Sequence, residues 1–290
     1  MAIDRLNLGM RGLSNYSIIK KWKIADIVLC VLLYVINIPI YYAAPFERQF
    51  SLNDLSLAHP HAETQRVGST ALLTYSLVIP IVTIVLVSFV LADSQHRSYL
   101  AFVSVLGLSV SWVANNLVTD FLKNLIGRPR PDFLARCKPK EGTPVDVLVT
   151  AAEVCTSKNL GRLRDGFRST PSGHSSESFA GLGYLSLWLA GQLLVQNPAV
   201  SQIRKALAFL PLVGAVTIAL SRTEDYRHHF VDVILGSCLG MFFAYNAYFA
   251  YFPGLSCEVP FKPLLDDTDL ADNYDESAAG DEEATPLRSN

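Results

Sequence analysis

Six long apolar stretches are the feature that most constrains the fold of this chain. A bilayer core of about 30 Å requires about 20 apolar residues per helical crossing. Half of the 290 residues are hydrophobic and only 17% are charged, which is too little polar surface for a soluble chain of this length. The stretches are residues 24–42, which include Asp26, and residues 71–92, 99–119, 178–196, 206–220 and 233–252. The sequence therefore predicts an all-α, polytopic membrane protein with six transmembrane helices.

Polar segments flank this predicted membrane domain. We expect an N-terminal segment at residues 1–22, a six-helix membrane domain at residues 23–255 and an acidic tail at residues 256–290. From Asp266 onwards the tail carries nine acids and one arginine, with almost no large apolar side chains. This composition predicts a disordered and solvated tail.

The distribution of basic residues predicts which side of the membrane each loop faces. Five basic residues precede the first apolar stretch, whereas residues 43–70 contain two. By the positive-inside rule, both termini are cytosolic and the loops after stretches one, three and five are lumenal. By the same rule, the basic loop from Lys123 to Arg168 favours the opposite orientation, but an anion site there would itself require those charges. An oxidising lumen would also permit a disulfide between Cys137 and Cys155 of that loop.

Three polar clusters fall at the same predicted membrane face. They are KNLIGRPRP at residues 123–131, TPSGHSSES at residues 170–178 and SRTEDYRHHFVDV at residues 221–233. Lys123, Arg130 and Arg222 supply positive charge, and guanidinium groups suit the oxygens of a phosphoryl group. Ser172 and Gly173 precede a predicted helix, where free backbone N–H groups attract phosphate. The clusters therefore predict one phosphate-binding site at this face.

Two histidines in these clusters are candidates for proton transfer and nucleophilic attack. His228 and Asp232 lie four residues apart, so they share a face if that turn is helical. Asp232 would then orient one ring nitrogen of His228 and leave the other free to attack. His174 would donate a proton to the leaving oxygen. His229 lies outside this register, and we assign it no catalytic role.

The clusters, taken in order, resemble the signature motifs of a known family. K-x6-R-P, P-S-G-H and S-R-x5-H-x3-D match those of the phosphatidic acid phosphatase type 2 superfamily, and YYAAPFERQFSLNDLSLAHP is similar to its fungal diacylglycerol pyrophosphate phosphatase branch. The resemblance implies a His228 nucleophile, a His174 general acid, a phosphohistidine intermediate and no metal or other cofactor. It implies phospholipid substrates, namely diacylglycerol pyrophosphate, phosphatidate and lysophosphatidate, and no nucleic-acid partner. It also favours a vacuole-like endomembrane, with the active site lumenal.

Two other functions stay open at this point. A lipid phosphotransferase would use the same histidine and aspartate with an alcohol in place of water. A transporter would place charge inside the bilayer along a solute path. The predicted spans after the first are nearly free of charge at their centres, which favours an enzyme. His59 and His61 lie in a loop without a partner pattern, and we expect them to be solvated.

Overall fold

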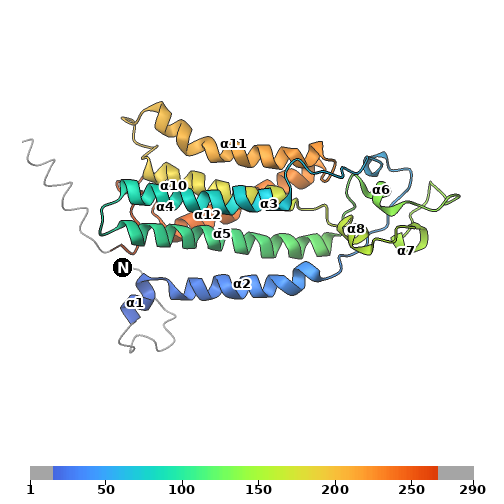
Figure 1. Cartoon of the computed structure of the whole chain (residues 1–290), viewed down its shortest axis with the longest axis horizontal. Helices are drawn as coiled ribbons and strands as arrows, with labels where there is room; N and C mark the ends of the chain where they lie inside the picture. Colours follow the sequence, from blue (N-terminus) through green and yellow to red (C-terminus); the bar gives the residue numbers. More distant parts are fainter. Residues whose placement is uncertain (1–15, 267–290) are drawn as a thin grey trace, which may run out of the picture.

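In the computed structural model, long helices run side by side along one axis (Figure 1). The structure describes residues 16–266, whose regular elements are all helices with no β-strand among them, so the predicted all-α class is confirmed. Six helical segments run along the bundle: α2 (Ile24–Tyr42), the continuous run of α3 (Ser69–Leu73), η3 (Thr74–Val78) and α4 (Ile79–Leu91), α5 (Arg97–Ile126), the continuous run of α9 (Gly173–Ser178), η4 (Phe179–Gly183) and α10 (Tyr184–Gln192), α11 (Gln202–Glu224) and α12 (Phe230–Tyr251). Shorter elements are α1 (Tyr16–Lys21) and η2 (Leu55–Leu57).

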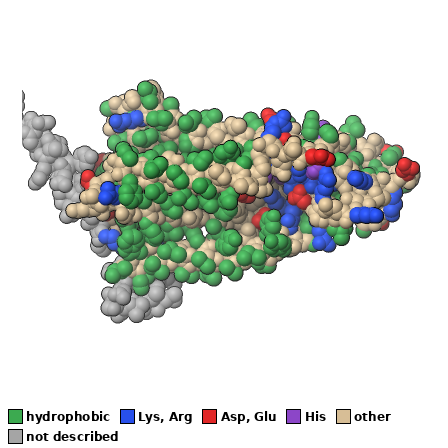
Figure 2. Space-filling model, in the orientation of Figure 1, with side chains coloured by type: hydrophobic (Ala, Val, Ile, Leu, Met, Phe, Trp, Pro, Cys, Tyr) green, Lys and Arg blue, Asp and Glu red, His purple; other side chains and the backbone are tan. Residues whose placement is uncertain are grey.

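Five of these segments are long and apolar enough to cross a membrane. They are α2, the run from α3 to α4, α5, α11 and α12. No residue of α2 is buried inside the protein, and apolar side chains are spread along the face of the bundle seen in Figure 2. Such a surface is stable against lipid chains but not against water. The five helices therefore indicate an integral membrane protein.

The observed helix ends differ from the predicted ends where polar residues continue a helix. The first predicted span matches α2, but α5 extends beyond the predicted end at residue 119 to Ile126. α11 likewise extends to Glu224 and contains Pro211. Asn115 and Thr119 are buried in the protein, so the polar side of α5 faces protein and not lipid. A search for apolar runs ends too early on such a helix, and Lys123 consequently lies in a helix.

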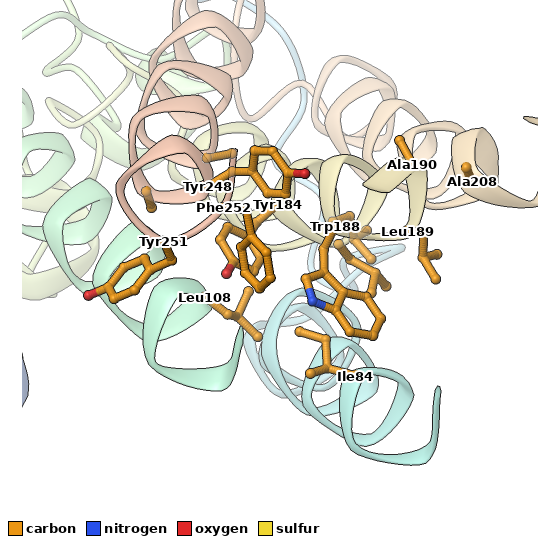
Figure 3. Packing of buried hydrophobic residues seen from close by; sticks show 14 of the residues in the cluster. Ile84, Leu108, Tyr184, Trp188, Leu189, Ala190, Ala208, Tyr248, Tyr251 and Phe252 are labelled. Carbon is orange, nitrogen blue, oxygen red and sulfur yellow. The ribbon is translucent and has the colours of Figure 1, made fainter. Parts of the chain in front are cut away.

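The run from α9 to α10 is the central helix of the bundle. It contacts α5, α11 and α12, and its Tyr184 and Trp188 are fully buried (Figure 3). The Trp188 indole N–H donates to the Ser104 hydroxyl at 2.7 Å. The run begins at Gly173, five positions before the predicted start at residue 178, because its polar first turns are enclosed by protein.

The two ends of the described chain meet at one end of the bundle. The Tyr251 hydroxyl donates to the Asp26 carboxylate at 2.8 Å, which joins the end of α12 to the start of α2. Residues 256–266, assigned above to the tail, pack against the bundle, since the Gln192 amide donates to the Phe261 carbonyl. The rest of the predicted disordered tail, residues 267–290, lies outside the described residues, as do residues 1–15.

A cap covers the opposite end of the bundle. We define the cap as residues 43–68 and 127–172, which include α6 (Phe133–Cys137), α7 (Ala151–Val154) and α8 (Leu160–Asp165) (Figure 1). Phe50, Phe133 and Phe167 form the centre of its own small apolar core. A disulfide joins Cys137 at the end of α6 to Cys155 after α7.

This disulfide should stabilise the cap measurably. A cross-link over a separation of 18 residues restricts the unfolded chain, which is typically worth about 3 kcal/mol. We expect non-reducing peptide mapping of protein from native membranes to find Cys137 linked to Cys155. Replacing both with serine should lower the midpoint of thermal unfolding in detergent, whereas Cys257→Ser, at an exposed free cysteine, should not. Free thiols at both positions would contradict the linkage.

Candidate active site

A polar cavity of about 400 Å³ lies where the bundle meets the cap. On the face seen in Figure 2, charged side chains are most numerous around this end. Six of the eight predicted site residues line the cavity: Lys123, Arg130, Gly173, His174, Arg222 and His228. They come from α5, the segment after it, α9, the end of α11 and the segment before α12. The fold therefore brings together three clusters that are distant in sequence.

His228 is buried in the floor of this site with one ring nitrogen fixed. Its Nδ1 lies 2.7 Å from the carbonyl oxygen of Ser169. A carbonyl oxygen only accepts, so Nδ1 carries the proton and Nε2 keeps its lone pair. Burial, followed by the positive charges of Arg130 and Lys123, lowers the pKa of His228 well below 6.5. His228 is consequently a neutral imidazole whose free electron pair is at Nε2.

The predicted hydrogen bond between His228 and Asp232 does not form between these two described residues. His229 has an extended backbone and precedes the first residue of α12, so His228 does not share the helical face of Asp232. The assumption that this turn is helical was wrong. The buried Asp232 carboxylate instead accepts hydrogen bonds from the hydroxyls of Ser169 and Thr170, from Arg128 Nη1 at 2.9 Å and from the His229 backbone N–H at 2.9 Å.

Asp232 nevertheless reaches His228 through one intervening residue. The Ser169 hydroxyl donates to Asp232 Oδ2 at 2.6 Å, while the Ser169 carbonyl accepts from His228. Asp232 therefore holds the residue that fixes the His228 tautomer. Arg128 forms an ion pair of 2.9 Å with the other Asp232 oxygen.

Each cavity-lining arginine of the predicted site is held by its own aspartate. Arg130 Nη2 donates to Asp165 Oδ1 at 2.9 Å, and Arg222 Nη2 donates to Asp225 Oδ2 at 2.9 Å. Partial burial raises the pKa of Asp165, but the guanidinium groups of Arg130 and Arg136 outweigh it and hold the pKa below its usual range. The Asp165 carboxylate therefore stays ionised, and each aspartate keeps its guanidinium group in place.

Lys123, Gly173 and His174 form a second side of the cavity. A Cβ atom on Gly173 would lie 2.6 Å from Lys123 Nζ, so the absence of a side chain makes room for the ammonium group. His174 Nε2 lies 3.1 Å from the Val67 carbonyl oxygen. Nε2 therefore carries a proton, and Nδ1 is the ring nitrogen at which a proton can be gained or released.

Ser172 caps the central helix and does not line the cavity. Its hydroxyl accepts from the Ser175 backbone N–H at 3.4 Å, and its own N–H donates to the Asp232 carbonyl at 2.9 Å. Ser172 therefore joins the start of α9 to the start of α12. The Ser172 backbone N–H is therefore already used, and phosphate binding by Ser172 stays a prediction.

The segment from His59 to Val67 forms one wall of the site. This role of the segment was not predicted from the sequence. The expectation of solvated histidines was wrong: His59 stacks on Tyr226 with ring centres 4.3 Å apart, and His61 Nδ1 lies 2.5 Å from Asp132 Oδ2. The Gln65 side chain accepts from Arg222 at 2.9 Å. These partners are more than seventy residues away in sequence, so no local pattern indicates them.

Two acids also line the cavity without having been predicted. Asp120 lies one turn before Lys123 in α5, and Glu177 lies three residues after His174 in α9. Each acid lies three residues from a predicted site residue on the same helix, and this spacing could have indicated both of them.

A helical membrane bundle with a cation-lined cavity at one end is the class of protein that these features define.

Comparisons with known proteins agree with this class. Residues 104–253 match the family model of the PAP2 superfamily. The chain is 53% identical over 274 residues to diacylglycerol pyrophosphate phosphatase 1 of Saccharomyces cerevisiae, covering 94% of this chain and 95% of that protein. It is 42% identical over 211 residues to a probable diacylglycerol pyrophosphate phosphatase 1 of Schizosaccharomyces pombe, covering 73% and 74%. It is 32% identical over 253 residues to lipid phosphate phosphatase 2 of Arabidopsis thaliana, covering 87% and 85%.

The chain belongs to the PAP2 superfamily, as its motifs predicted. No solved structure matches it.

The environment of His228 predicts an unusual titration. A lowered pKa keeps the ring neutral as the pH falls through 6.5, where an ordinary histidine becomes charged. In protein carrying ring-labelled histidine, we expect the His228 nuclear magnetic resonance signal to titrate with a midpoint well below 6.5. The His228→Gln variant assigns the signal. A midpoint at or above 6.5 would contradict the buried, cation-flanked environment.

Proposed function

We propose that this protein is a lipid phosphatase that removes the outer phosphate of diacylglycerol pyrophosphate and also acts on phosphatidate and lysophosphatidate. The observation that carries the proposal is the free Nε2 of His228 in a cavity lined by Lys123, Arg130 and Arg222. The names of the relatives support the substrate class, since two are diacylglycerol pyrophosphate phosphatases and a third is a lipid phosphate phosphatase.

The far side of the cavity suits a lipid. Tyr34 of α2, Leu72 of α3, and Trp112 and Val113 of α5 line it, so the cavity continues from the charged end into the apolar part of the bundle. A phosphate headgroup can then lie among the cations while its glycerol and acyl chains follow the helices. This continuity favours a phospholipid over a water-soluble phosphate ester.

The geometry supports a two-step reaction. The three cations hold the phosphoryl oxygens, and His228 Nε2 attacks phosphorus, so that a P–N bond forms as the P–O bond to the leaving group breaks. His174, which must carry a second proton on Nδ1 for this step, donates that proton to the leaving oxygen, and the Ser169 carbonyl accepts from Nδ1–H of His228 as that ring gains positive charge. Water then cleaves the phosphohistidine and releases phosphate.

The same cations make a metal ion unnecessary in this reaction. Lys123, Arg130 and Arg222 already neutralise the phosphoryl charge that a metal would otherwise balance. Within residues 16–266, no group of three His, Cys, Asp or Glu side chains is placed to hold a metal ion. We therefore infer a reaction without cofactors.

We also infer that the cavity faces the lumen of a vacuole-like endomembrane and that the termini are cytosolic. The run from α9 to α10 would be the sixth crossing, within a membrane domain at residues 23–255. The start of α2 and the end of α12 meet opposite the cap, and the disulfide in the cap suits an oxidising lumen. The peptide mapping described above tests this placement, because a cytosolic cap would keep both thiols free. Co-fractionation with vacuolar membranes tests the organelle.

Loss of the nucleophile tests the proposed function. Purified protein in detergent should release phosphate from diacylglycerol pyrophosphate and phosphatidate, and should do so in the presence of EDTA. His228→Ala should lower the rate by about four orders of magnitude or more and remove an acid-labile phosphoprotein. His229→Ala, which keeps the backbone bond to Asp232, should retain the phosphoprotein. A labelled phosphoprotein in His228→Ala would refute this nucleophile, and phosphorylated alcohol products would indicate a phosphotransferase.

The role of His174 should depend on the leaving group. Cleavage of phosphatidate expels the basic alkoxide of diacylglycerol, which needs a proton, whereas cleavage of diacylglycerol pyrophosphate at its outer phosphorus expels phosphatidate, a far less basic phosphate. We expect His174→Ala to slow phosphorylation of His228 more with phosphatidate than with diacylglycerol pyrophosphate. Single-turnover measurement isolates this step from the later attack of water. Equal losses with the two lipids would show that His174 is not the leaving-group acid.

A further inference from the structure

We infer that Asp165 is a positioning residue that directs one end of the Arg130 guanidinium to the phosphoryl group. Asp165 lies at the end of α8 in the cap, outside all three motifs. The inference rests on the proposed function, because it assigns Arg130 to the phosphoryl oxygens of the substrate.

Asp165 holds one edge of the Arg130 guanidinium with two acceptors. Arg130 Nη2 donates to Asp165 Oδ1 and Arg130 Nε donates to the Asp165 backbone carbonyl, both at 2.9 Å. These two donors lie on the same edge of the planar group, so the pair of bonds fixes both its position and its plane. The Nη1 end has no hydrogen-bond partner among the described residues, and Arg130 lines the cavity. That end is therefore the one available to a phosphoryl oxygen.

The second oxygen of Asp165 is fixed from behind by a buried arginine. Arg136 Nη1 donates to Asp165 Oδ2 at 2.8 Å, and Arg136 Nε donates to Asp132 Oδ1 at 2.9 Å. Arg136 is 2% exposed and precedes Cys137, whose disulfide ties α6 to the rest of the cap. Asp165 is thus held between a rigid part of the cap and the side chain that it directs.

The charge of Asp165 by itself opposes the binding of a phosphate. The Asp165 side chain is 43% exposed and lines the same cavity, so it repels an anion there. If Asp165 only adjusted the net charge of the cavity, removing its charge would strengthen anion binding. If Asp165 positions Arg130, removing its charge would weaken anion binding. The two roles therefore predict opposite signs for one measurement.

Orthovanadate, a phosphate analogue, provides that measurement in the full-length protein in detergent. Vanadate binding is measured by thermal shift and by inhibition. We expect Asp165→Asn to weaken it about tenfold, because an amide N–H would then face a guanidinium donor. The kcat/KM for diacylglycerol pyrophosphate should fall by at least the same factor. Asp146→Asn is the matched control, because Asp146 is an exposed acid of the cap that bonds only Asn53 among the described residues. Unchanged or tighter vanadate binding in Asp165→Asn would overturn the inference.

The Asp165→Glu variant distinguishes an effect of the carboxylate position from an effect of its charge. It also provides the test if Asp165→Asn does not fold. It keeps the negative charge but moves the carboxylate by one methylene group. Positioning predicts weaker vanadate binding in this variant, whereas a role through charge alone predicts no change, and an unchanged affinity would refute positioning.

A double-mutant cycle tests whether Asp165 acts through Arg130. In the Arg130→Lys background, Asp165→Asn should change vanadate binding far less than it does in the wild type, because the side chain that Asp165 directs is absent. Additive losses would refute action through Arg130. Vanadate binding and lipid hydrolysis are read separately. A wild type that binds vanadate but releases no phosphate would overturn the proposed function, whereas lipid hydrolysis by the wild type together with an unchanged vanadate affinity in Asp165→Asn would overturn this inference alone.

Discussion

The buried carboxylate of Asp232 is the interaction on which the site depends. It accepts from Arg128 in the segment after α5, from Ser169 and Thr170 before α9, and from the His229 backbone just before α12. Those are the three segments that carry the motifs. An ionised carboxylate without exposure to water requires several donors, and here each donor comes from a segment that must be brought to the cavity. The same bonds that satisfy the charge therefore assemble the site.

Further ion pairs let the protein keep cations in a partly buried cavity. Arg130 pairs with Asp165 and Arg222 with Asp225, while each arginine still lines the cavity. An unpaired guanidinium in such a place would be strongly unfavourable, and in Arg130 the pairing of the Nε and Nη2 edge leaves the Nη1 end for a ligand. Stability of the empty protein and affinity for an anion thus depend on different parts of one side chain.

The sequence predicted the helical class and the segments that meet at the cavity, because apolar periodicity and motif order are local properties. It did not predict how these segments contact each other. The expected bond from Asp232 to His228 rested on a helical register, but the chain at His229 is extended and the helix begins one residue later. The contacts of Gln65 and Asp165 with the two arginines depend on the folding of the cap, for which hydrophobic patterning carries no signal. Such contacts are fixed by packing between distant segments and could not be read from spacing.

Close packing of the central helix explains why these contacts can hold their distances. A Cβ on Gly236 of α12 would lie 2.5 Å from the Ser172 carbonyl oxygen, and one on Gly240 would lie 2.1 Å from that of Ser176. The backbones of α12 and α9 therefore touch directly, without flexible side chains between them. This contact fixes the start of α9, which carries His174, relative to the start of α12, which carries Asp232. A side chain at Gly240 would separate the two helices. The spacing of polar groups in the cavity therefore depends on Gly236 and Gly240, which lie about one and two helical turns from Asp232 along α12 and do not line the cavity.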